Sequence, residues 1–353
     1  MAFVYTLPQE RIAKRPVVPY DQAKLLIVNR RNGEIGESVF ADLPNFLNAS
    51  DKLIFNRTFV RKARFLIVDD RGREIEILLL RRRGDGSWLG SGRPLKALLA
   101  GSRLPIAEGV FVEILQRSSP REIVIRFQAD NLTEDQIIDR FGLMPIPPYI
   151  RGGKADQFDE SDYQTPFSAL SGESSSGSSA APTASLHFTP ALLESLAQAG
   201  ISFDYITLDL GQYSFVEAEN FINASTVGVE EYLFDPKLLL RLEKWRENTG
   251  KIIAVGTSVV RALESGSLFK LGGLEATNFP EQIASRQPTD LFISKGFNFR
   301  MVDKLITNFH MPGSTHLLLV EAFLGEELLE KSYRYALENN FRFLSYGDGM
   351  LIV

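Results

Sequence analysis

The sequence contains no cysteine and only three histidines, His187, His310 and His316, among its 353 residues. The absence of cysteine excludes disulfides, thiolate nucleophiles, iron-sulfur clusters and cysteine-ligated zinc. Any catalysis must therefore come from oxygen, nitrogen and backbone groups. The formal net charge of -5 argues against binding of a polyanion by the whole surface, but it leaves room for local basic patches.

The chain also lacks a long apolar run. None of its hydrophobic stretches approaches the roughly 20 residues that a membrane helix needs, so we expect no membrane span. Residues 1–21 show no apolar segment between a basic start and a small-residue cleavage site, the pattern that a secretory signal requires. We therefore expect a cytoplasmic protein.

A length of 353 residues exceeds what one hydrophobic core usually supports, which predicts two domains. From about residue 59 to 128, short β-rich runs are separated by Gly, Pro and charged turns, a pattern typical of a small β-barrel. After the proline-rich segment 145–152, helix and strand patterns alternate, and the first 55 residues are also strand-rich. We predict a large α/β domain with a mixed sheet, formed by residues 1–57 and 149–353, and an inserted antiparallel β-barrel at 58–148.

Two segments have unusual composition. Between Arg57 and Lys96, eleven Lys or Arg stand against five Asp or Glu, and Arg64 and the run 81–83 belong to this basic stripe. The stripe is either the solvated face of a small β domain or a surface that binds phosphates. The Ser- and Gly-rich segment 171–185 predicts a linker-like loop.

The first candidate for chemistry lies at His187. Thr189 followed by Pro190 is a typical N-cap with proline at the first helical position, so His187 and Phe188 precede a helix start that favours anions. A histidine at this place is either a proton carrier or a loop residue satisfied by backbone hydrogen bonds.

The second candidate is the segment 251–266. An apolar strand is expected to run into Gly256, Thr257 and Ser258 and then into a helix, which is the place where open α/β sheets bind ligands. The segment lacks the lysine and the second glycine of a Walker loop. Arg261 and Glu264, three positions apart on the helix, either serve a ligand or pair with each other.

The third candidate follows a strand that ends in Asn308. The chain turns through His310 and Pro312 into a helix that we expect to be capped near Ser314 or Thr315. Three strand or helix junctions of this kind in one domain predict a shared cleft.

A further turn lies near the carboxyl terminus of the chain. Tyr346 and Asp348 interrupt two expected β runs there, although turn chemistry alone is an alternative explanation for Asp348.

Long segments of the chain resemble a single protein family. The stretches YTLPQERIAKRPVVPYDQAKLLIV, MPIPPYIRGG, DYQTPF, AAPTASLHFT, IAVGTSVVRALES, FISKGFNFRMVDKLITNFHMPGSTHLLLVEAF and FRFLSYGDGMLI are similar, in order and spacing, to segments of the S-adenosylmethionine:tRNA ribosyltransferase-isomerases of queuosine biosynthesis. The resemblance spans nearly the whole chain. It implies an α/β domain with an inserted β-barrel, in agreement with the pattern above.

The resemblance also implies an activity. That family transfers and isomerises the ribosyl group of S-adenosylmethionine onto a 7-aminomethyl-7-deazaguanine base in a tRNA anticodon, which gives epoxyqueuosine and releases adenine and methionine. It implies S-adenosylmethionine and a tRNA with a GUN anticodon as substrates, and no metal. We further expect a monomer.

Site residues follow from the same resemblance. His187, His310 and Asp348 are candidates for proton handling and orientation, with Asp209 as a further candidate base. The residues expected to line the ligand site are Thr183, Gly256, Thr257, Ser258, Arg261, Asn308 and Tyr346. Arg64 and the basic stripe are expected to meet tRNA phosphates, which would make binding strongly salt-dependent.

The chain departs from the family pattern at several polar positions. It reads Asn-Arg-Thr-Phe at 56–59 where the family usually has Asn-Asp-Thr-Arg. Asp209 stands where the family has a histidine, Tyr213 and Ser214 alter the turn that follows, and Ser185 replaces a glycine. An aspartate of ordinary pKa, about 3.9, is a weak base unless burial raises that pKa. Two alternatives therefore stay open: a paralogue that uses a similar ligand with another acceptor, and a non-catalytic tRNA-binding protein.

Overall fold

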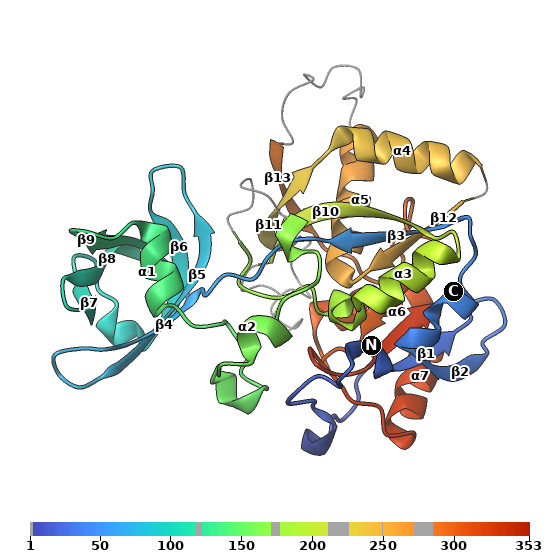
Figure 1. The fold of residues 1–353 in the computed structure, drawn as a ribbon, viewed down its shortest axis with the longest axis horizontal. Helices are drawn as coiled ribbons and strands as arrows, with labels where there is room; N and C mark the ends of the chain where they lie inside the picture. The colour runs from blue at the N-terminus through green and yellow to red at the C-terminus, as the bar shows by residue number, and fades with distance from the viewer. Residues whose placement is uncertain (1–2, 118–121, 171–176, 211–225, 249, 272–284) are drawn as a thin grey trace. The chain divides into compact units, whose positions relative to one another are not determined.

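The computed structural model describes residues 3–117, 122–170, 177–210, 226–248, 250–271 and 285–353 (Figure 1). The chain divides into two compact units. The large unit comprises Met1–Thr58, Gln164–Ser175 and Pro182–Val353, and the barrel unit comprises Phe59–Tyr163 and Ser176–Ala181. The predicted fold class is confirmed, because the first unit holds a mixed sheet with helices and the second an antiparallel barrel-like sheet.

Within the described residues, nine strands form the sheet of the large unit, in the order β13-β11-β10-β3-β12-β14-β15-β1-β2. The four central strands β10, β3, β12 and β14 are mutually parallel, whereas β15 is antiparallel to β14 and β11 is antiparallel to β10. The strands are β1 (Lys24–Val28), β2 (Ile35–Val39), β3 (Asp51–Asn56), β10 (Ser202–Asp209), β11 (Thr226–Phe234), β12 (Lys251–Val255), β13 (Ser285–Leu291), β14 (Lys304–Asn308) and β15 (Gly349–Ile352).

Helices cover both faces of this sheet, which agrees with the apolar middle residues of β3, β12 and β14. Leu192 and Leu196 of α3 pack with Phe55 and Val255 on one face, and α5 contacts β3, β10 and β12. The helices of the large unit are α3 (Pro190–Gln198), α4 (Pro236–Glu247), α5 (Thr257–Leu271), α6 (Thr315–Leu324) and α7 (Glu326–Glu338). No helix in the described part of the chain combines the length and hydropathy needed to cross a bilayer.

Local sequence signals place the starts of these helices. The Thr189 hydroxyl accepts a hydrogen bond from the amide of Leu192 at 3.1 Å, and Pro190 occupies the first turn of α3. The Ser314 hydroxyl accepts from the amide of Leu317 at 3.2 Å at the start of α6. Both expected caps are therefore confirmed, because a hydroxyl before the first turn satisfies an amide that has no partner within the helix.

In the barrel unit, six strands pair antiparallel in the order β4-β5-β6-β9-β8-β7, and the end strands β4 and β7 contact each other. Trp88 and Phe65 are buried in its core, against which α1 packs Ile137 and Ile138. The elements are β4 (Arg64–Val68), β5 (Glu74–Arg82), β6 (Trp88–Arg93), β7 (Arg103–Ala107), β8 (Val110–Arg117), β9 (Ile123–Ala129), α1 (Glu134–Phe141) and α2 (Asp159–Asp162).

The structure differs from the sequence-based expectations in three places. The strands β6 and β7 and the helix α1 were not predicted, because Gly, Pro and charged residues obscure their patterns. The expected β run at 341–344 is wrong: Phe343 forms only an isolated bridge with Ile12, and Leu344 has a φ of 70°, which turns the chain. The segments 149–163 and 176–181 belong to the barrel unit rather than to the large unit. They join it because the Gly153 carbonyl accepts a hydrogen bond from Arg64 and Ser178 bridges Val60.

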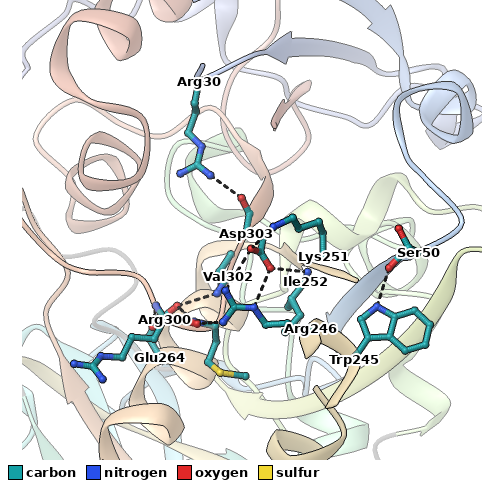
Figure 2. Close-up of polar contacts among 11 residues, drawn as sticks. Arg30, Ser50, Trp245, Arg246, Lys251, Ile252, Glu264, Arg300, Val302 and Asp303 are labelled. Atoms are coloured by element: carbon teal, nitrogen blue, oxygen red, sulfur yellow. Dashed lines mark hydrogen bonds and ion pairs between the residues drawn. The ribbon is translucent and has the colours of Figure 1, made fainter. Parts of the chain in front are cut away.

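The carboxylate of Asp303 joins the amino ends of two central strands (Figure 2). It accepts a hydrogen bond from the amide of Ile252 at 3.0 Å and lies 3.3 Å from the ammonium group of Lys251, at the start of β12. Arg246 of α4 reaches the same carboxylate at 3.4 Å. Arg30, just after β1, donates to the backbone carbonyl of Asp303 at 2.7 Å. One residue therefore connects β12, β14, α4 and the segment after β1.

Glu264 of α5 supports the same region. Its buried carboxylate accepts hydrogen bonds from the backbone amides of Arg300, Met301 and Val302 at 2.9, 3.0 and 3.1 Å, and part of this network is drawn in Figure 2. Burial raises the pKa of this carboxyl, although the three amides oppose that rise. The segment that leads into β14 is thereby fixed to α5.

Replacement of Asp303 should destabilise the large unit. Asp303→Ala removes a carboxylate that accepts hydrogen bonds from a backbone amide and contacts two charged side chains. Hydrogen bonds to charged groups are worth about 1.5–3 kcal/mol each. We expect the free energy of unfolding to fall by about 2–4 kcal/mol. Urea unfolding followed by tryptophan fluorescence checks this, because Trp245 reports the large unit and Trp88 the barrel unit. The exposed Asp290→Ala is the matched control, and an equal loss in both variants would contradict the assignment.

Candidate functional site

The parallel strands bring several predicted site residues to one edge of the sheet. Ile206 of β10 lies opposite Asn56 of β3, and Val255 of β12 lies opposite Ile306 of β14. Because the carboxyl ends of parallel strands meet at the same edge, the ends of β10, β3, β12 and β14 are successive neighbours there. The expected convergence of the junctions after β12 and β14 is therefore confirmed.

Three of the predicted residues meet at Asn308, the last residue of β14. The hydroxyl of Thr183 donates to the side-chain oxygen of Asn308 at 2.9 Å. The side-chain nitrogen of Asn308 lies 3.3 Å from Nε2 of His187, and both residues are buried. Thr183 and His187 belong to a short 3-10 helix, Thr183–His187, so the junction before α3 reaches the same edge through Asn308.

The ring of His187 is enclosed. It stacks on Phe40, with ring centroids 4.0 Å apart and planes inclined by 17°, and its other polar contact is a hydrogen bond with the backbone of Tyr20. Burial lowers the pKa of His187 to about 3. Since an amide nitrogen can only donate, Nε2 accepts from Asn308 and Nδ1 carries the proton. The imidazole is thus neutral near pH 7, and its two nitrogens are both engaged.

Asp348 fastens a turn beside this group. Its carboxylate accepts from the backbone amides of Arg342 and Lys24 at 2.7 and 3.1 Å and from the guanidinium of Arg342 at 3.2 Å. The backbone carbonyl of Asp348 in turn accepts from Asn308 at 3.5 Å. Tyr346 is 1% exposed in the same turn. These contacts indicate that Asp348 orients the turn and Asn308 rather than contacting a ligand directly.

The turn after β12 presents amides and hydroxyls to the edge. Gly256 has a φ of 96°, which favours glycine, and its amide donates to the carbonyl of Ile306 at 2.8 Å. A Cβ at this position would lie 3.6 Å from the Cβ of Ala184, so the turn approaches the helix that carries His187. The hydroxyls of Thr257 and Ser258, at the start of α5, make no hydrogen bond with any described residue.

Arg261 does not pair with Glu264, so that expectation is wrong. The guanidinium of Arg261 contacts the carboxylate of Glu230 on β11 and donates to the carbonyl of Leu291 at 3.2 Å. Glu264 is instead occupied by the three backbone amides described above. A second donor of Arg261, Nη2, is buried without a hydrogen-bond partner in the described chain.

His310 forms a pair with a histidine that the sequence analysis did not assign to the site. Its ring stacks on His316, with centroids 5.3 Å apart and planes inclined by 20°, and its Nε2 lies 2.8 Å from the hydroxyl of Thr307. Burial, followed by the neighbouring His316, lowers the pKa of His310 well below its usual range. Burial, followed by Arg261, lowers the pKa of His316 to about 4. In the sequence, this pair was indicated only by the spacing of six residues between the two histidines, across a capped turn.

Asp209 lies apart from these histidines. It ends β10, three strand positions from β14, which is roughly 14 Å across the sheet. Its carboxylate accepts a hydrogen bond from the hydroxyl of Thr58 at 2.6 Å, and Arg57 donates to the hydroxyl of Thr207 at 3.1 Å. Two departures from the family pattern, at Arg57 and at Asp209, thus lie at neighbouring strand ends, and Thr58, which matches the family, contacts Asp209. Tyr213 and Ser214, and residues 171–176 of the Ser-rich segment, lie outside the described residues.

In the barrel unit, the basic stripe is largely neutralised by neighbouring acids. The prediction that Arg64 meets phosphates is wrong: its side chain is 9% exposed, lies 3.4 Å from Glu76 and donates to the Gly153 carbonyl. The other ion pairs are Arg61–Asp135, Lys62–Glu160, Arg73–Asp69, Arg82–Glu134 and Arg93–Glu76. The exposed side chains of Arg71, Arg83 and Lys96 make no ion pair with a described residue.

No group of three or more acidic or histidine side chains in the described ranges is arranged to hold a metal ion.

Comparisons with known proteins agree on one family. A family model described as "Queuosine biosynthesis protein" matches residues 1–352. Curated S-adenosylmethionine:tRNA ribosyltransferase-isomerases from Syntrophomonas wolfei and Halothermothrix orenii are each 38% identical to the chain, over 99% of it and over 96% and 98% of their own lengths. The crystal structure of an S-adenosylmethionine tRNA ribosyltransferase from Thermotoga maritima is similar at 30% identity, covers 99% of both chains and gives a TM-score of 0.52.

The lowered pKa values of the histidines predict a loss of stability in acid. Unfolded histidine has a pKa of about 6.5, whereas His187 and His316 titrate at about 3 and about 4 in the folded protein. The unfolded chain therefore binds protons first, and stability falls as the pH drops from about 6.5 toward 4. Urea unfolding at about pH 7.5 and about pH 5 should show this loss, and His316→Leu should reduce it. Equal losses in the two proteins would exclude His316 as a cause.

Proposed function

The chain belongs to the family of queuosine biosynthesis proteins, and from this membership we propose that it is an S-adenosylmethionine:tRNA ribosyltransferase-isomerase. The reaction transfers and isomerises the ribosyl group of S-adenosylmethionine onto 7-aminomethyl-7-deazaguanine in tRNA. The observation that carries the proposal is the match of the family model to residues 1–352, supported by relatives that are 38% identical over nearly their whole length.

The chemistry requires proton transfers at defined places. The sulfonium of S-adenosylmethionine acidifies the adjacent ribose carbon, so a base can remove a proton there. Adenine then leaves with a proton, and the amine of the nucleobase attacks the activated ribosyl fragment, which finally releases methionine. The site must therefore supply a base, a proton donor for adenine and a pocket for a cationic ligand.

We assign proton handling first to His310. It is half-buried, and its Nδ1 makes no hydrogen bond within the described chain, whereas Nε2 is held by Thr307. Both ring nitrogens of His187 and both carboxylate oxygens of Asp348 are hydrogen-bonded. These residues are therefore better suited to orient Asn308 and the turn at 342–348 than to transfer a proton. Asp209 is a second candidate base, on the β10 side of the edge.

The ligand is proposed to lie along the loops after β12 and β14. The amides at the start of α5 and the unpaired hydroxyls of Thr257 and Ser258 offer donors and acceptors there, next to Gly256. The other residues proposed to contribute are Thr183, Arg261, Asn308 and Tyr346. S-adenosylmethionine serves as the ribosyl donor, and no metal takes part.

The tRNA is proposed to carry a GUN anticodon and to meet exposed basic residues of the barrel unit. Arg83, Arg71 and Lys96 suit this part better than Arg64, because their side chains are exposed and make no ion pair with a described residue. We further propose that the protein acts in the cytoplasm as a monomer.

Adenine release is the test of this function. The purified protein should release adenine from S-adenosylmethionine only with tRNA that carries the 7-aminomethyl-7-deazaguanine base. His310→Gln should lower the rate about a hundredfold, because general acid-base catalysis contributes on that order, while the exposed Glu338→Gln should leave it unchanged. Release without tRNA would indicate another acceptor. Salt-sensitive tRNA binding without release would indicate a non-catalytic binding protein.

A salt titration tests the phosphate contact of Arg83. If Arg83 meets a phosphate, Arg83→Gln should reduce the slope of log K against log salt by about 1. Arg73→Gln is the matched control, because Asp69 lies 2.6 Å from its guanidinium and already balances the charge. Filter binding or fluorescence anisotropy with the cognate tRNA measures both slopes, and an unchanged slope for Arg83→Gln would remove Arg83 from the interface.

A further inference from the structure

Two tyrosines from opposite ends of the chain hold the backbone of one residue. The hydroxyl of Tyr333, on α7, accepts a hydrogen bond from the amide of His310 at 3.0 Å. The hydroxyl of Tyr5 donates to the carbonyl of the same His310. Both polar backbone groups of His310 are therefore satisfied by side chains, at a position where strand pairing has ended and loop backbone usually has more freedom.

The tyrosine rings that carry these hydroxyls are themselves fixed. The ring of Tyr5 packs edge-on against Tyr333 with centroids 5.0 Å apart, and Phe3 stacks on Tyr5 at 5.7 Å. Tyr333 is fully buried and also packs edge-on against Phe309 at 5.3 Å. Burial raises the pKa of both tyrosines, so both hydroxyls keep their protons over the working pH range. Phenylalanine would fill the same space, so packing alone does not explain the two hydroxyls.

The imidazole of His310 is restrained on two further sides. Thr307 occupies Nε2 at 2.8 Å, and His316 covers one face of the ring. The titratable groups around the ring are His316 from α6, Tyr333 from α7 and Tyr5 from the amino-terminal segment. Arg261 lies beyond His316, and its charge is balanced by Glu230. Only Nδ1 is left without a hydrogen bond among the described residues.

We propose that Tyr5 and Tyr333 are positioning residues for His310, and that their hydroxyls hold its backbone so that Nδ1 is presented to the reacting groups. This inference rests on the proposed function, in which His310 handles a proton. It makes the amino-terminal segment part of the catalytic apparatus through Tyr5. Misplacement of a reacting group by about 1 Å can cost on the order of a hundredfold in rate, so two backbone hydrogen bonds can matter for turnover.

Removal of each hydroxyl tests the proposal. Tyr5→Phe and Tyr333→Phe keep the rings and delete only the hydrogen bonds. We expect kcat for adenine release to fall at least about tenfold in each, while KM for both substrates stays within about threefold. Tyr335→Phe is the matched control on the same helix, because its hydroxyl lies 3.5 Å from Glu37 and does not approach His310. A packing role alone would lower the melting temperature and leave kcat unchanged, which would overturn the proposal.

A second measurement does not depend on turnover. Because the chain has three histidines, ¹⁵N-histidine labelling gives a simple NMR spectrum in which each ring is assigned by substitution. The ring signals of His310 should shift or broaden in Tyr5→Phe and Tyr333→Phe, while those of His187 should not. Unchanged His310 signals would overturn the positioning role. If the wild-type protein released no adenine while these shifts appeared, the proposed function would fail and the placement of His310 by the two tyrosines would stand.

Discussion

The parallel register of β10, β3, β12 and β14 is the constraint on which the site depends, and ion pairs at the amino ends of these strands hold that register. Asp303 connects the starts of β12 and β14, Lys304 lies 2.7 Å from Asp51 at the start of β3, and Lys52 lies 3.8 Å from Asp204 of β10. Partly buried pairs of this kind are poorly screened by salt. The pairs at Asp303 and Lys52 connect neighbouring strands, and the Lys304–Asp51 pair connects β14 with β3 across β12. A slip of one residue would separate these charges and also turn each strand's side chains to the opposite face. The carboxyl ends of the strands, at the opposite edge, are thereby positioned as well.

The three histidines at that opposite edge are neutral. Burial keeps His187, His310 and His316 uncharged near pH 7, and the polar contacts around them come from hydroxyls, amides and backbone carbonyls. A neutral imidazole can accept a proton and does not repel a cationic sulfonium, and the nearby Arg261 and Arg342 are each paired with a carboxylate. The engaged groups, such as both nitrogens of His187, give rigidity, whereas the groups with unused capacity, Nδ1 of His310 and the hydroxyls of Thr257 and Ser258, are those a substrate can meet. Polar groups whose hydrogen bonds are satisfied therefore orient the site, whereas those with unused hydrogen-bonding capacity are available for the chemistry.

The sequence predicted what is local and missed what depends on distant partners. The turn at Gly256 and the caps at Thr189 and Ser314 were correct, because each is decided by a few adjacent residues. The pairing of Arg261 was wrong because its partner, Glu230, is 31 positions away on β11, while the helical neighbour Glu264 is occupied by backbone amides. Arg64 looked like a surface cation, and only the fold shows that it is buried beside Glu76 and Gly153. His316 was not assigned to the site, because its contact with His310 depends on the geometry of the turn between them.

The structure also shows how two departures of this chain from its family pattern are related. In sequence, the changes at 57 and at 209 are separate replacements of one polar residue by another. In the structure they share one corner, where β3 and β10 end side by side and the Thr58 hydroxyl donates to Asp209. A carboxylate accepts hydrogen bonds and cannot donate them, so an aspartate at 209 is stable beside a hydroxyl donor and would be repelled by a second carboxylate at the end of β3. A change at one of these positions therefore alters what the other tolerates. The corner holds a satisfied polar pair in which Thr58 matches the family and Asp209 does not, while the edge from Gly256 to His310 carries the hydroxyls, amides and imidazole that the proposed reaction needs.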